Sequence, residues 1–301
     1  MATMLAMVQQ AAGEMGLSVP TAVAGNTSTD VVQQLALLNA VGYELQRKYL
    51  WEALNKEYRF TTSYLTTTGT VTSGSAVITS IPSTSTLAAG SWMVSGIGIP
   101  NDCYISSVNS STQVTLNQAA TISGTAVNLT FGKTKYALPS DFDRQIDRTQ
   151  FDKSKRWEML GPETPEQWQW LKSSYISTGP RIRYRILGGT FQIWPIVSTA
   201  EYLGFEYVSN EWATSASGTA QTSFLADTDT CIFPDRLMVL GLKKKYFEIK
   251  GFDTTALTRD YEDELSIAKA NDQGSPTLSM APRVSSILIG WENIPDSNYG
   301  S

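Results

Sequence analysis

The side chains best suited to chemistry in this sequence are carboxylates ahead of a predicted helix. Asp227, Asp229 and Asp235 lie close together in the chain, and a pair of carboxylates at a suitable separation can hydrolyse a glycosidic bond. Aspartates at such places more commonly form turns or put negative charge at a helix N-terminus. We therefore expect structural roles for all three and no catalytic residues.

Other catalytic groups are scarce. The 301 residues contain no histidine, which removes the commonest general base and the commonest transition-metal ligand. Cys103 and Cys231 are too far apart in sequence to indicate a zinc site or a disulfide framework, so we expect reduced thiols. The chain is predicted to be no enzyme and to hold no cofactor or metal. A glycoside hydrolase that uses carboxylates alone stays open as an alternative.

Composition limits the partners. A net charge of −5 disfavours a protein that grips phosphate backbones, although DNA could still slide past an acidic wall. Hydrophobic residues make up 42% and charged residues 17%, which is typical of a globular chain whose surface is partly covered by partners. No apolar run reaches the roughly 18 residues of a membrane span, and the N-terminus lacks a basic start. We expect a soluble, intracellular protein with no membrane contact.

Helical signals lie toward both ends of the chain. Apolar residues at spacings of three and four, together with capping residues, carry these signals. A short helix is predicted after Thr164, which serves as its N-cap, with Pro165 at the first helical position and Gln167 closing a capping box. The longer predicted helices are Ala2–Met15, Asp30 to about Leu54 with Ser28 or Thr29 as N-cap, Pro234 or Asp235 to Lys250, and a last one that begins at Asp253 or Thr254.

The segment Thr66–Gly132 has a different composition. Ser, Thr, Gly and Val dominate it, Lys and Arg are absent, and short alternating runs between turn residues indicate strands. We predict an inserted β-module with no nucleic-acid contact. Its flanks, Glu57–Tyr64 and Lys133–Asp143, are predicted to be paired strands of one sheet, because insertions succeed at exposed loop tips.

A second group of strands follows. Arg181–Ile186 alternates strictly, Gly188-Gly189 supplies a tight turn and Phe191–Trp194 returns, which predicts a hairpin. Leu203–Tyr207 is expected to complete a three-stranded meander. Its polar face, with Arg181, Arg183 and Arg185, fits solvent better than an acidic partner or DNA.

Two further sets of side chains have structural interpretations. Lys243, Lys244 and Lys245 point about 100° apart on a helix, which disfavours a shared phosphate site, so we expect contacts with solvent or at a rim. Trp168 and Trp170 are expected in the core or at an interface, although tryptophans can also stack on sugars.

These patterns predict an α+β fold in three parts. The first is a helical-bundle core with a small antiparallel β-meander, and the second is an inserted all-β, sandwich-like module. The third is an extended tail. The corresponding ranges are 1–65 with 133–274 for the core, 66–132 for the module and 275–301 for the tail.

The order of elements, with three short segments, resembles the head-to-tail adaptor (connector) proteins of tailed bacteriophages. The segments are Tyr136–Phe142, Gly204–Asn210 and Ala226–Asp229 leading into Ile232–Asp235. The likeness covers 2–57 and 134–271. The inserted module departs from the simplest adaptors, so a tail or fibre adhesin that binds a host glycan through this module stays open as an alternative.

The resemblance implies a structural role in the virion neck between capsid and tail, after assembly in the host cytoplasm. Adaptor subunits would form a ring, dodecameric by this likeness, with the helical bundle as its core. The ring would dock the portal protein ring above and present a platform to a tail nozzle or tube protein below. Genomic DNA would pass through its channel without specific binding.

Two candidate contact sites follow. An apolar cluster in the proline-punctuated tail is expected to bind the portal, because prolines leave a chain less entropy to lose on ordering. An acidic set in the last helix would line the channel or form a plain solvated face. The portal-binding residues are Val284, Ile287, Leu288, Ile289 and Trp291, and the channel-lining ones are Asp260, Asp263 and Glu264.

Overall fold

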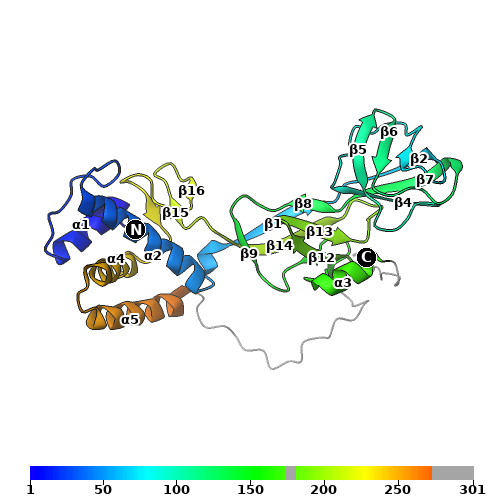
Figure 1. The fold of residues 1–301 in the computed structure, drawn as a ribbon. Helices are drawn as coiled ribbons and strands as arrows, with labels where there is room; N and C mark the ends of the chain where they lie inside the picture. The colour runs from blue at the N-terminus through cyan, green and yellow to red at the C-terminus, as the bar shows by residue number, and fades with distance from the viewer. Residues whose placement is uncertain (174–180, 273–301) are drawn as a thin grey trace, which may run out of the picture. The chain divides into compact units, whose positions relative to one another are not determined.

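A computed structural model describes residues 1–173 and 181–272 (Figure 1). They form five α-helices and several small antiparallel sheets, so the α+β prediction is confirmed. The chain divides into two compact units. Unit 1 contains residues 1–56, 141–145 and the described chain from 207 onward, and unit 2 contains residues 57–140 and 146–206. The predicted portal-binding cluster lies outside the described residues.

Unit 1 is built around one helix. Helix α4 contacts α1, α2 and α5 and buries every residue from Leu237 to Leu242, which agrees with the apolar residues predicted on more than one of its faces. None of the described helices is long and apolar enough to cross a bilayer. The helices of unit 1 are α1 (Met4–Glu14), α2 (Thr29–Lys48), α4 (Asp235–Lys250) and α5 (Thr255–Asp272).

Helix α2 ends earlier than its apolar pattern predicts. Ser28 is its N-cap residue, as expected, but the helix stops at Lys48, and a 3-10 turn at Glu52–Leu54 follows. The buried indole of Trp51 explains the stop, because its Nε1 donates to the carbonyl of Leu45 at 2.7 Å. That bond satisfies one of the carbonyls left open at the end of the helix.

A buried tryptophan fills the centre of unit 1. Trp212 is fully buried and makes ring contacts with Phe224 and Phe233. Its indole lies against α2 at Gly42, where an added Cβ would stand 2.3 Å from ring carbons. Trp212 directly precedes β15 (Ala213–Thr214) in the chain. This strand is the middle one of a three-stranded sheet in the order β16-β15-β17, with β16 (Ala220–Gln221) and β17 (Thr230–Cys231).

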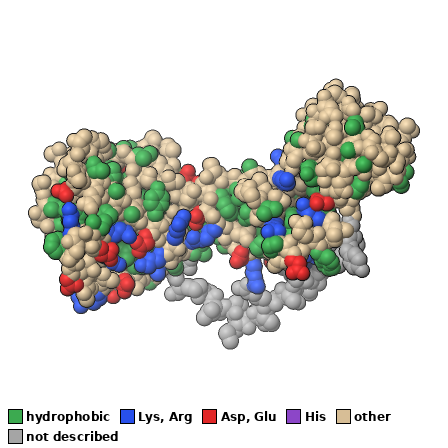
Figure 2. Space-filling model, viewed as in Figure 1, with side chains coloured by type: hydrophobic (Ala, Val, Ile, Leu, Met, Phe, Trp, Pro, Cys, Tyr) green, Lys and Arg blue, Asp and Glu red, His purple; other side chains and the backbone are tan. Residues whose placement is uncertain are grey.

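The predicted β-module forms two three-stranded sheets in unit 2. They share one buried core that includes Ile78, Trp92, Leu129 and Phe131. Figure 2 shows almost no charged side chains over these strands. The first sheet, in the order β2-β7-β4, consists of Tyr64–Val71, Gly124–Lys133 and Trp92–Gly96. The second, in the order β3-β6-β5, consists of Val77–Ile78, Gln113–Leu116 and Ile105–Ser110.

The backbones of the module's two flanks meet where the amide of Lys133 donates to the carbonyl of Ser63 at 2.9 Å. The described sheets contain no strand pair between the flanks, so that prediction was wrong. Strand β1 (Asn55–Thr61) lies beside β14, whereas β8 (Lys135–Ala137) pairs with β13. The module closes on itself instead, because β2 pairs with β7 as far as Tyr64 opposite Gly132. Strand β1 therefore joins the sheet of β14, whereas β8 joins that of β13.

The predicted hairpin is confirmed, but the meander is not. Strands β12 (Arg183–Leu187) and β13 (Thr190–Trp194) are joined at Gly188 and Gly189, which both have positive φ, as a tight turn requires. The third strand of their sheet is β8. Strand β14 (Tyr202–Ser209) belongs to another sheet, and Phe205 stacks on Phe191 of β13 with ring centroids 4.9 Å apart. The apolar side chains of β14 therefore pack on β13 from a second sheet, and β14 does not pair with it as a neighbouring strand.

The remaining elements are the strands that share the sheet of β14 and one short helix. Its sheet has the order β1-β14-β10-β11, with β10 (Phe151–Asp152) and β11 (Trp157–Glu158) forming a short hairpin. Helix α3 (Pro165–Lys172) has the predicted capping box of Thr164 and Gln167. Within unit 1, strand β9 (Phe142–Gln145) pairs with residues 207–209 at the end of β14.

Candidate functional site

The three aspartates considered for catalysis hold backbone segments. Asp227 accepts hydrogen bonds from the amides of Val23 and Ala24 at 2.9 and 2.7 Å. Asp229 accepts from two amides of its own turn, and Asp235 accepts from the amide of Ala2 at 2.8 Å. These carboxylates serve the loops around α1 and the start of α4, so their positions are those of structural residues.

The thiols are also withdrawn from solvent. Cys103 and Cys231 are buried and not bonded to each other. Burial raises the pKa of Cys103 to about 11 and that of Cys231 to about 12, so neither is a thiolate at neutral pH. Among the described residues, no three His, Cys, Asp or Glu side chains gather where they could hold a metal ion.

A polar cluster in unit 1 joins two of the segments that carry the family resemblance. The buried carboxylate of Asp141 accepts from the Tyr207 hydroxyl at 2.9 Å and the Ser209 hydroxyl at 2.8 Å. Lys56 donates to it at 2.7 Å and also pairs with Glu211 at 3.0 Å. This contact could not be predicted from the sequence, because nothing local in the chain relates residue 141 to residues 207 and 209.

The electrostatics of this cluster favour the ionised carboxylate. Burial by itself raises the pKa of Asp141, but the hydrogen bonds from Lys56, Ser209 and Tyr207 outweigh it and hold the pKa below its usual value. Burial by itself lowers the pKa of Lys56, but its hydrogen bonds to Asp141 and Glu211 outweigh that effect and raise the pKa. The cluster is therefore a fully charged, hydrogen-bonded brace at neutral pH.

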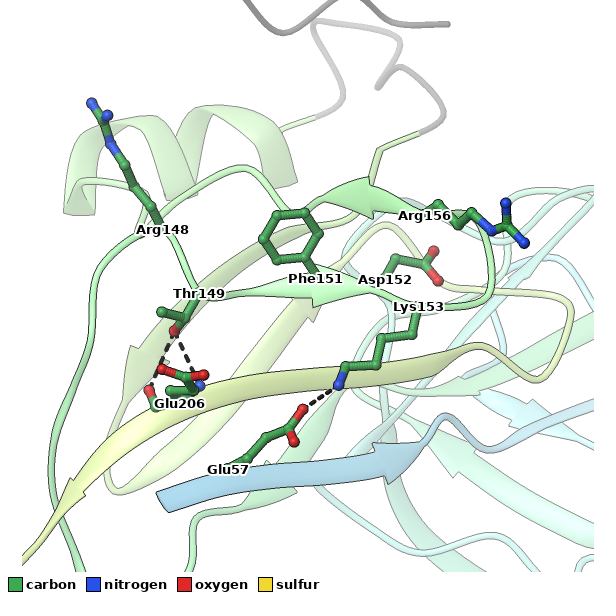
Figure 3. A pocket seen from close by; sticks show the side chains of 8 residues that line it. All are labelled: Glu57, Arg148, Thr149, Phe151, Asp152, Lys153, Arg156 and Glu206. Carbon is green, nitrogen blue, oxygen red and sulfur yellow. Dashed lines mark hydrogen bonds and ion pairs between the residues drawn. The ribbon is translucent and has the colours of Figure 1, made fainter. Parts of the chain in front are cut away.

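A groove of unit 2 lies beside the β10–β11 hairpin (Figure 3). It encloses about 580 Å³ and is open to solvent. The half-exposed ring of Phe151 stands between Arg148 and Arg156. Both arginines have positive φ values, +63° and +58°, which is uncommon for residues other than glycine, asparagine and aspartate.

The floor of the groove is ionic. Glu57 of β1 accepts from Lys153, as Figure 3 shows, and also from Arg59. The hydrogen bond from Arg59, followed by that from Lys153, lowers the pKa of Glu57 to about 2. Burial raises the pKa of Asp152, which is only 2% exposed and accepts from the amides of Ser154 and Lys155.

Two carboxylates with oppositely shifted pKa values can divide the roles of acid and base. In this groove Glu57 is occupied by two cations, and Asp152 is too buried to reach a substrate. The Thr149 hydroxyl is held by the backbone, because it donates to the carbonyl of Ile146 at 2.7 Å and accepts from the amide of Glu206 at 3.0 Å. The arrangement fits a binding surface better than an active site.

The remaining charged sets behave as solvated or structural groups. The three consecutive lysines point in different directions and pair with separate carboxylates: Lys243 with Glu14, Lys244 with Glu248 and Lys245 with Glu44. In the predicted arginine stripe, Arg183 pairs with Glu163 at 2.6 Å. Trp168 is buried, whereas Trp170 is half exposed.

The acidic residues of α5 form no compact site of their own. Asp260 and Asp263 are exposed, and Glu264 is partly buried and forms an ion pair with Arg236 at 3.2 Å. Asp260 lies 3.4 Å from its neighbour Arg259, which is itself exposed. The structure thus puts two of the three predicted channel residues at the surface of unit 1.

Comparison with known families decides the identity. The model of the SU10 adaptor protein family matches residues 106–283, which is more than half of the chain. The chain belongs to the SU10 adaptor protein family. No curated protein matches it significantly.

Membership makes this SU10-family protein a phage structural adaptor and supports a place in the virion. The matched region begins inside β5, so the family model includes the second half of the β-module, which the resemblance had treated as outside the adaptor part. It also covers both segments joined at Asp141.

Proposed function

We propose that this SU10-family adaptor is a head-to-tail connector that forms a ring, docks the capsid portal and presents a platform to the tail. The family match carries this proposal. The ring would continue the DNA channel in the virion neck, and its function would reside in geometry. Its subunit number, dodecameric by resemblance, belongs to the proposal.

Within this proposal, α1, α2, α4 and α5 act as a helical-bundle core for the ring. Ion pairs that cross between helices support such a role: Lys243 of α4 reaches Glu14 of α1, and Lys245 of α4 reaches Glu44 of α2, both at 2.7 Å. The two sheets of residues 66–132 act as a sandwich-like inserted domain, and residues 275–301 act as the extended tail.

The acidic residues of α5 are proposed to face the channel. Exposed carboxylates repel the DNA backbone, and a wall that repels DNA lets it slide. The test is Asp260→Lys with Asp263→Lys in phage particles: we expect normal assembly and slower genome release at low salt. An unchanged release rate would assign these residues to an outer face.

The portal contact is proposed to lie in the apolar cluster of residues 284–291. Truncation after Gly274 should spare the fold of both units and prevent attachment to purified portal rings, measured by co-sedimentation. Equal binding by the full-length and truncated proteins would move the portal contact to the helical core. Electron microscopy of the protein mixed with portal rings tests ring formation itself.

A further inference from the structure

One carboxylate of unit 1 has only half of its hydrogen-bonding capacity in use. Asp235 is the first residue of α4, and its Oδ2 accepts from the backbone nitrogen of Ala2 at 2.8 Å. Its other oxygen, Oδ1, is buried and has no hydrogen-bond partner among the described residues. The neighbouring Arg236 does not supply one, because it pairs with Glu264 at 3.2 Å. A buried carboxylate oxygen without a donor is costly, so a further donor is expected here.

The chain before α1 is fixed beside this carboxylate by backbone hydrogen bonds. The amide of Met4 donates to the carbonyl of Asp229 at 2.7 Å, and the amide of Leu5 donates to the carbonyl of Asp227 at 3.2 Å. The side chain of Met4 is fully buried. The packing of α1 therefore holds the Ala2 nitrogen in its place.

The residue before Ala2 lies mostly in solvent. Met1 is 85% exposed, so its loss would leave the packing of α1 intact. Its peptide link limits the Ala2 nitrogen to one hydrogen, which is already directed to Oδ2 of Asp235. A free amino group on the same nitrogen would be mostly an ammonium at neutral pH, with three hydrogens. It could donate to Oδ1 as well as to Oδ2.

We propose that the peptide bond between Met1 and Ala2 is cleaved, and that the α-ammonium of Ala2 forms an ion pair with Asp235. The step is a hydrolysis catalysed by a host peptidase that accepts a small residue after the cleaved bond. The C–N bond breaks, the water oxygen bonds to the Met1 carbonyl carbon, and both water protons end on the Ala2 nitrogen. The proposal goes beyond the connector function and does not rest on it.

The charges favour this pairing. Ala2 directly precedes Thr3, the N-cap residue of α1, and a positive charge at that end opposes the dipole of the helix. The carboxylate of Asp235 offsets the charge and lies in the first turn of α4, where a negative charge is favourable. A charge-assisted hydrogen bond is roughly twice as strong as a neutral one. The cleaved chain should therefore be more stable than the uncleaved one.

Mass spectrometry of the full chain purified from bacterial cells tests the cleavage. We expect the N-terminal peptide to begin at Ala2 with a free amino group. A peptide that retains Met1, or any residue before it, overturns the proposal, and so does an acetylated Ala2. The measurement does not depend on ring formation, so its outcome is separate from that of the connector function.

Thermal melting tests the ion pair. The full chain with a free Ala2 amino group should melt roughly 3 °C or more above an N-acetylated form, which has the single amide hydrogen again. Asp235→Asn should abolish this difference between the two forms, whatever it does to stability itself. Asp260→Asn on exposed α5 is the matched control and should preserve the difference. Equal melting of the free and acetylated wild-type forms, or a difference that survives in Asp235→Asn, overturns the pairing.

Discussion

The carboxylate of Asp141 lies 2.7 Å from the ammonium nitrogen of Lys56, 85 residues earlier in the chain. The same carboxylate accepts from Tyr207 and Ser209, so three distant segments of unit 1 meet at one charge. Buried charges are tolerated only when they are paired and hydrogen-bonded. The contact therefore fixes β9 against the end of β14.

We predict that Asp141→Asn destabilises unit 1. The NH2 group of the amide would face a donor in place of one carboxylate oxygen, either the Tyr207 hydroxyl or the pair of Lys56 and Ser209. We expect a loss of about 2–3 kcal/mol in the free energy of unfolding. Urea unfolding followed by circular dichroism measures it. The control is Asp260→Asn on exposed α5, which should change stability by less than about 0.5 kcal/mol. Equal effects of the two substitutions would contradict the bracing role.

The depressed pKa of Asp141 predicts a loss of stability in acid. A carboxyl group whose pKa is lower in the folded state contributes stability above its unfolded pKa of about 4, and that contribution disappears as pH falls through the folded pKa. Between about pH 6 and about pH 3 the wild type should lose more stability than Asp141→Asn. Parallel pH profiles for the two proteins would show that this group does not contribute.

Gly42→Ala is predicted to destabilise unit 1 despite its better helix propensity. The new methyl group would stand 2.3 Å from the Trp212 ring, which is fully buried and cannot move aside. Overpacking of this kind costs about 1–3 kcal/mol, against a propensity gain of at most about 1 kcal/mol. Gly13→Ala in α1 is the control, because nothing lies within 4 Å of its added methyl group. An increase in melting temperature for both variants would be the contrary result.

Replacement of residues 66–132 by a short Gly-Ser link should leave a folded remainder. Leu65 lies opposite Phe131, so the cut ends are adjacent, and the helices of unit 1 contain no residue of the module. The excision removes Met93, which packs on Trp168 and Trp194. We therefore expect the helical circular dichroism signal to persist, with α3 loosened. Loss of cooperative helical melting would refute the module's independence.

Met93→Ala in the full chain isolates the contact between the module and α3. Met93 is buried against Trp168, Leu171 and Trp194, and truncation of such a side chain costs about 2–5 kcal/mol. In the variant we expect a soluble quencher to reduce tryptophan fluorescence more than in the wild type, while the helical circular dichroism signal of unit 1 persists. Unchanged tryptophan quenching would show that the contact does not hold α3.

Local chemistry in the sequence determined several elements of this protein. Thr164 and Gln167 specify the start of α3 through a capping box, and Gly188-Gly189 specifies the β12–β13 turn, because these signals act between residues only a few positions apart. The composition of residues 66–132 likewise predicted a β-rich segment that has its own core in the structure.

The partners of the strands were decided by tertiary structure alone. Both β8 and β14 were predicted as strands near the right residues. In the structure, β8 pairs with β13, whereas β14 lies in a second sheet and stacks its Phe205 ring on Phe191. Alternation shows which face of a strand is apolar, and it does not show whether that face meets a neighbour in the same sheet or the face of another. The ion pair between Lys56 and Asp141 could not be predicted from the sequence either. Contacts between residues far apart in the chain depend on how all the elements pack, and no local sequence pattern indicates them.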